Sequence, residues 1–252
     1  MSILRVRDVS VRIGGLQILD GVSLDVPEGS IVGLIGPNGA GKTTVFNVVS
    51  GFVRPTQGSI EWRGEVRQPA PHDLVGLGIA RTLQAVGLFD SLTVEENLLI
   101  GAYKDNRGGT LSAAISAPWM RLRDSELRDR AAALMDSMGL ADVARRHAAE
   151  LPYPVRKRVG LARALMSDPQ LVMLDEPAGG IAQEDIDALA TLLRSWIPQR
   201  SVLVVEHHMD FVMSICDFIY VLEAGRIIAT GTPAEIQQNQ AVRTAYLGQV
   251  DA

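Results

Sequence analysis

The sequence predicts an α/β fold with an antiparallel β part near its N-terminus and a helical subdomain inserted into the core. The core follows from three short, mainly apolar runs, Ile31–Ile35, Leu171–Leu174 and Ser201–Glu206. Such runs, without regular polar alternation, are typical of strands covered on both faces, as in a parallel sheet. From about Ser91 to Ala149 helical periodicity replaces the strand patterns, which indicates the insertion.

Composition limits the function classes open to the chain. Its 252 residues suffice for one large domain or for a core with a small lobe, and 47% of them are apolar. The formal net charge of −5 does not favour bulk binding of nucleic acid. The single cysteine, Cys216, excludes an internal disulfide and is expected to be buried. No run reaches about 18 apolar residues, so we expect membrane association only through a partner.

Two strands are predicted before the first core strand. Apolar residues from Leu4 to Ile13 come in a broken alternation with charged ones, which predicts a half-exposed antiparallel strand. Gly14-Gly15 predicts a turn, and Leu19 to Val26 predicts a second strand that ends at Pro27.

A glycine-rich segment follows the first core strand and predicts a phosphate-binding loop. Gly36-Pro37-Asn38-Gly39-Ala40-Gly41-Lys42-Thr43 fits G-x-x-x-x-G-K-[ST], the P-loop pattern, and we extend the nucleotide site to Thr44. A helix is expected from Lys42 to Ser50. Glycines let backbone N–H groups surround a phosphate, and the helix N-terminus adds its positive dipole end. Lys42 can reach the β- and γ-phosphates, and Thr43 can offer its hydroxyl to Mg²⁺.

Two adjacent carboxylates, Asp175 and Glu176, end the second core run. In P-loop ATPases an Asp at such a strand end helps to hold Mg²⁺, and we assign this role to Asp175. Glu176 is placed to polarise an attacking water. An Asp–Glu pair after a core strand also occurs on ordinary surfaces, but a P-loop in the same chain favours the catalytic interpretation.

The inserted part is expected to be helical. Residues spaced i, i+4, i+7 and i+11 form an amphipathic stripe: Leu127, Ala131, Leu134 and Met138. Thr93 and Glu96 fit a capping box before an apolar segment. A further helix is expected from Val155 to Met166, and a hairpin is expected around Ala224-Gly225.

With these elements in this order, the chain resembles an ABC-transporter ATPase subunit from about Leu4 to Gly248. The resemblance implies a single ABC ATPase domain over residues 1–252. Its P-loop NTPase (RecA-like) core would hold residues 1–90 and 168–252, and residues 91–167 would form the helical subdomain that includes the signature-like region. Within the family the chain resembles the longer ATPase subunit of the branched-chain amino acid importer subgroup. Three segments carry this likeness: Gly14-Gly15-Leu16-Gln17, Ala80-Arg81-Thr82-Leu83-Gln84 and Ala245-Tyr246-Leu247-Gly248.

The resemblance also implies roles for single residues. Gln84 matches the Q-loop glutamine, whose amide can ligand Mg²⁺ and relay the nucleotide state to the helical subdomain. His207 resembles the switch histidine, which hydrogen-bonds the γ-phosphate and orients the water. Ile13 stands where the family stacks adenine on an aromatic residue, so we expect a weaker apolar contact. His208 stands where the family usually has Asp and receives no role.

The chain departs from the family at its signature. The family sequence Leu-Ser-Gly-Gly-Gln opens a helix and binds the γ-phosphate of ATP held by the opposite subunit. Here the matching stretch is Leu151-Pro152-Tyr153-Pro154-Val155. Pro152 supplies no hydroxyl, and Pro154 removes a backbone N–H donor, although proline suits the first turn of a helix. We expect the helix to persist and its phosphate binding to be weakened. Ala182 also replaces a usual Asp or Asn in the loop after the acidic strand.

The resemblance implies an ATP- and Mg²⁺-dependent subunit that powers an importer for branched-chain or related amino acids, or for urea or amides. Expected partners are a second ABC ATPase subunit, with a heterodimer favoured over a homodimer, transmembrane permease subunits and, indirectly, a solute-binding protein. No nucleic acid is expected. The chain would lie on the cytoplasmic side of the inner (plasma) membrane, held peripherally through its membrane subunits.

Other functions remain open to the sequence. One alternative is a non-transport or regulatory ABC ATPase, which uses ATP-driven dimerisation to clamp a soluble partner. A P-loop GTPase fits less well because the chain has no Asn-Lys-x-Asp element. A P-loop kinase fits poorly with Gln84 and His207.

Overall fold

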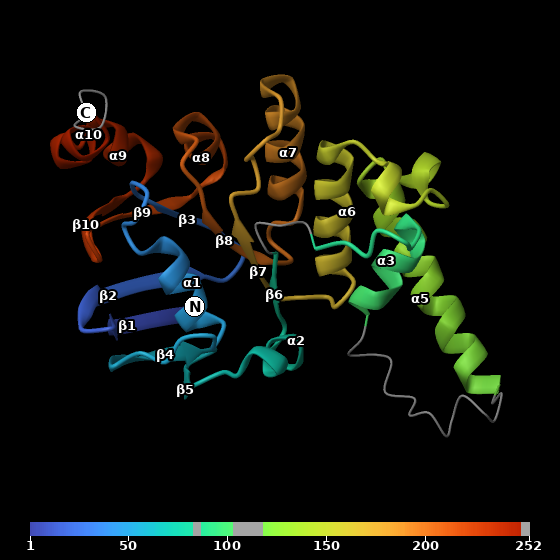
Figure 1. The fold of residues 1–252 in the computed structure, drawn as a ribbon, viewed down its shortest axis with the longest axis horizontal. Coiled ribbons are helices and arrows are strands. Elements are labelled where there is room, and N and C mark those ends of the chain that lie inside the picture. The colour runs from blue at the N-terminus through green and yellow to red at the C-terminus, as the bar shows by residue number, and fades with distance from the viewer. Residues whose placement is uncertain (83–86, 103–117, 248–252) are drawn as a thin grey trace. The chain divides into compact units, whose positions relative to one another are not determined.

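The computed structural model of the chain describes residues 1–82, 87–102 and 118–247 (Figure 1). The chain divides into two compact units. The first joins Met1–Leu74 to Gln170–Ala252, and the second spans Val75–Pro169. The short helix α2 (Leu74–Leu77) lies at the boundary in sequence.

The first unit contains an antiparallel sheet with the strand order β2-β1-β4-β5. Its strands are β1 (Ser2–Ile13), β2 (Leu16–Pro27), β4 (Gln57–Trp62) and β5 (Glu65–Arg67). Every pairing between them is antiparallel. The predicted antiparallel β part is therefore confirmed, and both predicted strands begin a few residues before the sequence pattern does.

The same unit contains five strands of a second sheet, in the order β10-β9-β3-β8-β7. They are β3 (Ile31–Ile35), β7 (Leu171–Asp175), β8 (Ser201–Val205), β9 (Phe218–Glu223) and β10 (Arg226–Gly231). Strand β3 is parallel to β8 and β9, β7 is parallel to β8, and β10 is antiparallel to β9. All residues of β3, β7 and β8 are buried, which confirms strands covered on both faces. Their carboxyl ends meet at one edge of the sheet.

Helices complete the first unit: α1 (Lys42–Val49), α7 (Gln183–Ser195), α8 (Met209–Ile215), α9 (Pro233–Gln238) and α10 (Gln240–Leu247). Helix α1 lies within one residue of its expected bounds and buries Val45, Phe46 and Val49. The hairpin between β9 and β10 is confirmed. Its turn residues, Ala224 and Gly225, have φ angles of 46° and 78°, as a two-residue hairpin turn requires.

The second unit contains strand β6 and three longer helices: β6 (Ile79–Arg81), α3 (Val94–Gly101), α5 (Pro118–Ser137) and α6 (Tyr153–Leu165). The capping box before α3 is confirmed. The N–H of Glu96 donates to Thr93 Oγ1 at 3.2 Å, and the N–H of Thr93 donates to Glu96 Oε2 at 2.8 Å. The hydrogen bonds from Thr93 lower the pKa of the Glu96 carboxyl.

The amphipathic stripe of α5 differs in detail from its prediction. Leu127, Ala131 and Met138 are buried as expected, whereas Leu134 is only half-buried and its neighbour Met135 is buried. Counted from Leu127, Leu134 is at i+7 and Met135 at i+8, and a helix with 3.6 residues per turn places both positions near the buried face, which explains the difference. Among the helices that the structure describes, none is both long enough and apolar enough to cross a membrane.

Candidate nucleotide site

The predicted P-loop connects the carboxyl end of β3 to the N-terminus of α1. Its first glycine, Gly36, has a φ of 155°, and a Cβ there would lie 2.0 Å from the carbonyl oxygen of Leu222. Only glycine can make so close an approach to a neighbouring strand. Gly41 is the N-cap of α1 at a φ of 108°. The loop therefore presents the first N–H groups of α1 at its mouth.

Lys42 is the buried cation of this loop. Its side chain is 7% exposed, and Nζ donates to the carbonyl oxygens of Gly36 at 2.7 Å and Pro37 at 2.9 Å. Burial lowers the pKa of Lys42, and the carboxylates of Glu176, Asp175 and Glu206 act against that shift. The three nearby anions thus favour the charged ammonium in the position that a phosphate would need.

The remaining loop residues divide into a buried and an open side. Ala40 is buried and Pro37 is half-buried, whereas Asn38, Gly39 and Thr43 are exposed. No atom lies within 4 Å of a Cβ built on Gly39. Thr44 is half-buried in the first turn of α1. The exposed side of the loop, which includes Thr43, is therefore accessible to a ligand.

The end of β7 places the two predicted carboxylates in different environments. Asp175 is the last residue of the strand and is 5% exposed, whereas the Glu176 side chain is 31% exposed. The N–H of Glu176 donates to the carbonyl oxygen of Val205 at 2.9 Å. Glu176 has a φ of 49°, a left-handed conformation that costs a non-glycine residue about 1–3 kcal/mol. Strain of this kind concentrates at functional sites.

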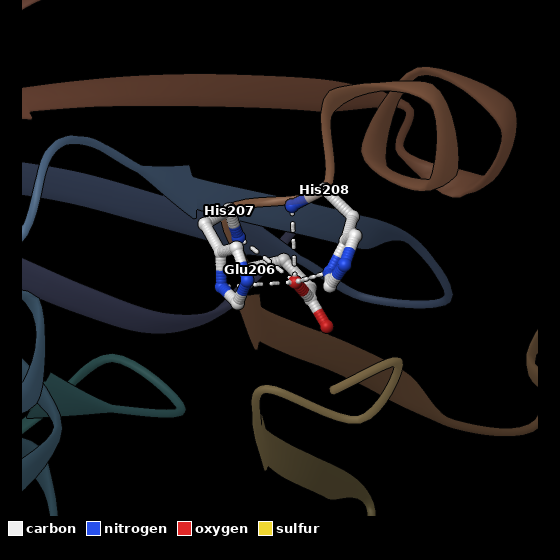
Figure 2. Close-up of side chains that lie close together, drawn as sticks. All are labelled: Glu206, His207 and His208. Atoms are coloured by element: carbon white, nitrogen blue, oxygen red, sulfur yellow. Dashed lines mark hydrogen bonds and ion pairs between the residues drawn. The ribbon is translucent and has the colours of Figure 1, made fainter. Parts of the chain in front are cut away.

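His207, from the segment after β8, comes close to Glu176. Nδ1 of His207 lies 3.7 Å from Glu176 Oε1 and 3.7 Å from Glu206 Oε2, and the imidazole is 45% exposed. Figure 2 shows Glu206 between the rings of His207 and His208. Parallel pairing of β7 with β8 thus brings together two residues that the sequence placed in separate motifs.

Sequence reasoning assigned no role to Glu206, although the structure buries it completely at this edge of the sheet. A signal for it was available, because Glu206 ends an apolar run just as Asp175 does. Both positions put a carboxylate at the carboxyl end of a parallel strand, where ligands of open α/β sheets bind.

Two other residues predicted to contact the nucleotide, Ile13 and Gln84, belong to other segments than Lys42, Glu176 and His207. Ile13 is 53% exposed at the end of β1 and pairs across the turn with Leu16, which is 70% exposed. Sequence reasoning did not single out Leu16, although the turn at Gly14-Gly15 implies that it opposes Ile13. Gln84 lies outside the described residues.

The signature-like stretch forms the start of α6 in the second unit. Pro152 is the N-cap and makes no side-chain cap hydrogen bond, and Pro154 lies in the first turn. The N–H of Arg156 donates to the carbonyl oxygen of Pro152 at 3.0 Å. The expectation that the helix persists despite its prolines is confirmed.

Comparison with known proteins gives the family. The ABC transporter family model matches residues 19–179, from β2 to the loop after Glu176. The chain belongs to the ABC transporter family. A second model, the branched-chain amino acid ATP-binding cassette transporter, matches residues 226–252 of this ABC protein.

Relatives of this ABC protein include a high-affinity branched-chain amino acid transport ATP-binding protein, LivG, of Salmonella typhimurium. The two are 41% identical over 251 residues, which cover 98% of each chain. A lipopolysaccharide export system ATP-binding protein, LptB, of Haemophilus influenzae is 34% identical and covers 99% of this chain and 98% of its own. The crystal structure of the ADP conformation of MJ1267, an ATP-binding cassette of an ABC transporter, superposes with a TM-score of 0.86 at 30% identity. That match covers 98% of this chain and 99% of the other. The family and the P-loop NTPase fold expected from the sequence are therefore confirmed.

Proposed function

We propose that this chain is the ATP-hydrolysing subunit of an ABC importer for branched-chain or related amino acids. One observation carries the ATPase part: parallel strands β3, β7 and β8 bring Lys42, Glu176 and His207 to one edge of a sheet. The amino-acid part rests on the 41% identity to LivG, which exceeds the 34% identity to LptB.

The P-loop supplies the phosphate site. Residues Gly36 to Thr44 surround the phosphates with backbone N–H groups and the N-terminus of α1. Nζ of Lys42 has three donors, of which two go to loop carbonyls, so one remains for a β- or γ-phosphate oxygen. Ile13 and Leu16 offer an exposed apolar pair for the adenine.

A magnesium ion fits the oxygen donors at the phosphate end of the site. The hydroxyl of Thr43, an exposed residue, and the carboxylate of Asp175 are hard oxygen ligands of the kind that Mg²⁺ prefers, and the amide of Gln84 is the third proposed donor. When bound, Mg²⁺ neutralises charge on the transferring phosphoryl group.

Glu176 and His207 act on the attacking water. The half-exposed Glu176 carboxylate accepts a hydrogen bond from the water and takes its proton as the water oxygen bonds to the γ-phosphorus. The bond from that phosphorus to the β–γ bridging oxygen breaks, and ADP leaves with the electron pair. His207, with Nδ1 3.7 Å from that carboxylate, orients the water and donates to the γ-phosphate from its exposed ring. Lys42 stabilises the charge that develops on the phosphoryl oxygens.

Substitution of the general base tests this function. Glu176→Gln removes proton acceptance while it preserves size, so kcat should fall by about 10²–10⁴-fold while ATP still binds. The measurement is steady-state ATPase activity of the chain combined with its ATPase partner and permease subunits, together with binding of a fluorescent ATP analogue. Glu28→Gln makes the same chemical change at an exposed turn and should leave kcat unaltered. Undiminished turnover in Glu176→Gln would remove the basis of the proposal.

We further propose that residues 1–252 form one ABC ATPase domain, with 91–167 as its helical subdomain, and that the chain pairs with a different ATPase subunit. The support is chemical: Pro154 offers no N–H to a γ-phosphate in the first turn of α6. A heterodimer would place this weakened helix at one ATP site and an intact one at the other. Permease subunits hold the pair at the cytoplasmic side of the membrane, and a solute-binding protein delivers the solute.

The same missing donor favours one alternative, a regulatory ABC ATPase that clamps a soluble partner. Co-purification separates the two functions. Transmembrane subunits retained in detergent, with ATPase activity stimulated by their reconstitution, support the importer. A soluble complex without membrane subunits supports the regulatory protein.

A further inference from the structure

Glu206, the residue after β8, is a fully buried carboxylate that accepts hydrogen bonds from two chain segments. Figure 2 shows its contacts with one of them, His207 and His208. Oε1 accepts from the N–H of Ala178 at 2.8 Å. Oε2 accepts from the N–H of His207 at 2.8 Å and the N–H of His208 at 3.2 Å. The ring Nδ1 of His208 lies 3.1 Å from the same oxygen.

These hydrogen bonds offset the free-energy cost of removing the Glu206 carboxylate from water. A buried carboxylate is tolerated when hydrogen bonds replace its hydration. Three of the four hydrogen bonds of Glu206 come from backbone N–H groups, which no rotation of the donor's side chain can withdraw. The carboxylate therefore constrains the path of the main chain on both sides of it.

The constrained path includes Glu176. The N–H of Glu176 donates to the carbonyl oxygen of Val205, and its own carbonyl accepts from the N–H of Gly179 at 3.1 Å. The N–H of Ala178, between these two bonds, is held by Glu206. The left-handed backbone of Glu176 thus lies in a turn that is bonded to Val205, the last residue of β8, and to Glu206, which follows it.

A metal ion is a less suitable occupant of this cluster. The side chains of Glu206, His207 and His208 bring ligand atoms within 4.8 Å of one another. Coordination by Oε2 would compete with the N–H groups of His207 and His208, and those donors cannot leave unless the main chain moves. The hydrogen-bonded carboxylate is the arrangement that the geometry favours.

We propose that Glu206 is a positioning residue for ATP hydrolysis: one carboxylate ties the loop after β7, which carries Glu176, to the segment after β8, which carries His207. It touches no substrate in this scheme. The proposal rests on the hydrolytic function proposed above, because its consequence for catalysis requires Glu176 and His207 to act together on the water.

Glu206→Gln tests the proposal at constant size. Ala178 donates to one carboxylate oxygen and His207 to the other, and the amide replaces one of these oxygens with a donor NH₂ group, so one of the two hydrogen bonds is lost. We expect kcat in the assembled transporter to fall about tenfold or more, since misplacement of a catalytic group by about 1 Å can cost 10²-fold. The KM for ATP should stay within about twofold, because the P-loop keeps its own contacts. Glu28→Gln is the matched control.

A measurement on the unsubstituted chain guards against failure of the variant to fold. The amide protons of Ala178 and His207 should be strongly protected from hydrogen exchange, although both residues lie outside the helices and strands. In folded Glu206→Gln the amide proton resonances of one of these residues, or of both, should move upfield and their protection should fall.

Each outcome is decisive for one of the two proposals. Normal kcat in folded Glu206→Gln, a raised KM with kcat unchanged, or unprotected Ala178 and His207 amides in the natural chain would overturn the positioning role. A lower melting temperature with normal kcat below it would reduce Glu206 to a structural residue. Absence of Glu176-dependent hydrolysis in the assembled natural protein would instead sink the proposed function, and the exchange data would still report whether Glu206 holds the two segments.

Discussion

Helix α7, which follows the loop after Glu176, begins without a side-chain cap. Its N-cap residue is Ala182, whose φ of −65° and ψ of 149° are the extended angles typical of an N-cap. Alanine has no side-chain oxygen that could accept from the N–H groups of the first turn. We therefore expect Ala182→Asn to stabilise the protein.

The size of the effect follows from the position. Replacement of a capping residue by alanine costs about 1 kcal/mol, within a range of about 0.5–2 kcal/mol, so the reverse change should gain about 1 kcal/mol. Asparagine is a better choice than aspartate because Glu184 and Asp185 already place negative charge in the first turn. For a chain of this length the gain corresponds to a rise of about 2–4 °C in the melting temperature.

Thermal unfolding followed by circular dichroism, without nucleotide, measures the change. Ala188→Asn is the matched control, because Ala188 is exposed in the interior of the same helix. Asparagine there should lower the stability by about 0.5–0.7 kcal/mol through its weaker helix propensity. Equal shifts of the two variants, or a lower melting temperature for Ala182→Asn, would refute the capping argument.

Three further predictions concern other parts of the molecule. Gly36→Ala should abolish folding of the P-loop, because its Cβ would lie 2.0 Å from the carbonyl oxygen of Leu222. Gly39→Ala should cost only about 1–2 kcal/mol of backbone strain at its φ of 80°. Expression yield and melting temperature of the two variants measure the difference. Burial raises the pKa of the Cys216 thiol to about 12, so a thiol reagent at pH 8 should label it only after unfolding. The thiol ionises at a lower pH in the unfolded chain than in the folded one, so the free energy of unfolding should fall as the pH rises from 9.0 towards 12. Rapid labelling of Cys216 in the native protein would contradict the burial on which both expectations rest. Pro154→Gly combined with Val155→Gln should raise turnover of the assembled ATPase by restoring an N–H donor, and unchanged turnover would show that the departure is harmless.

The parts of the fold that the sequence predicted depend on local chemistry. Strands β3, β7 and β8 are apolar apart from Gly33 and the terminal residues Asp175 and Ser201, and the P-loop, the Asp175-Glu176 pair and the Thr93 capping box are contiguous patterns. Each needs only its own residues to be recognised, since a strand covered on both faces must be apolar throughout and a phosphate loop must be rich in glycine. Family resemblance added His207, which no local pattern distinguishes from an ordinary histidine.

Tertiary structure alone decided how these groups act together. The sequence does not show that Asp175 is buried while Glu176 is half-exposed, because the difference arises where β7 leaves the sheet. The role proposed for Glu206 depends on a hydrogen bond from the N–H of Ala178, 28 residues earlier in the chain, and on parallel pairing of β7 with β8. Likewise, Leu16 becomes a neighbour of Ile13 only through the β1–β2 turn. Local patterns specify which residues carry chemistry, whereas strand pairing determines which of them meet, because the contacts join residues that are distant in the chain.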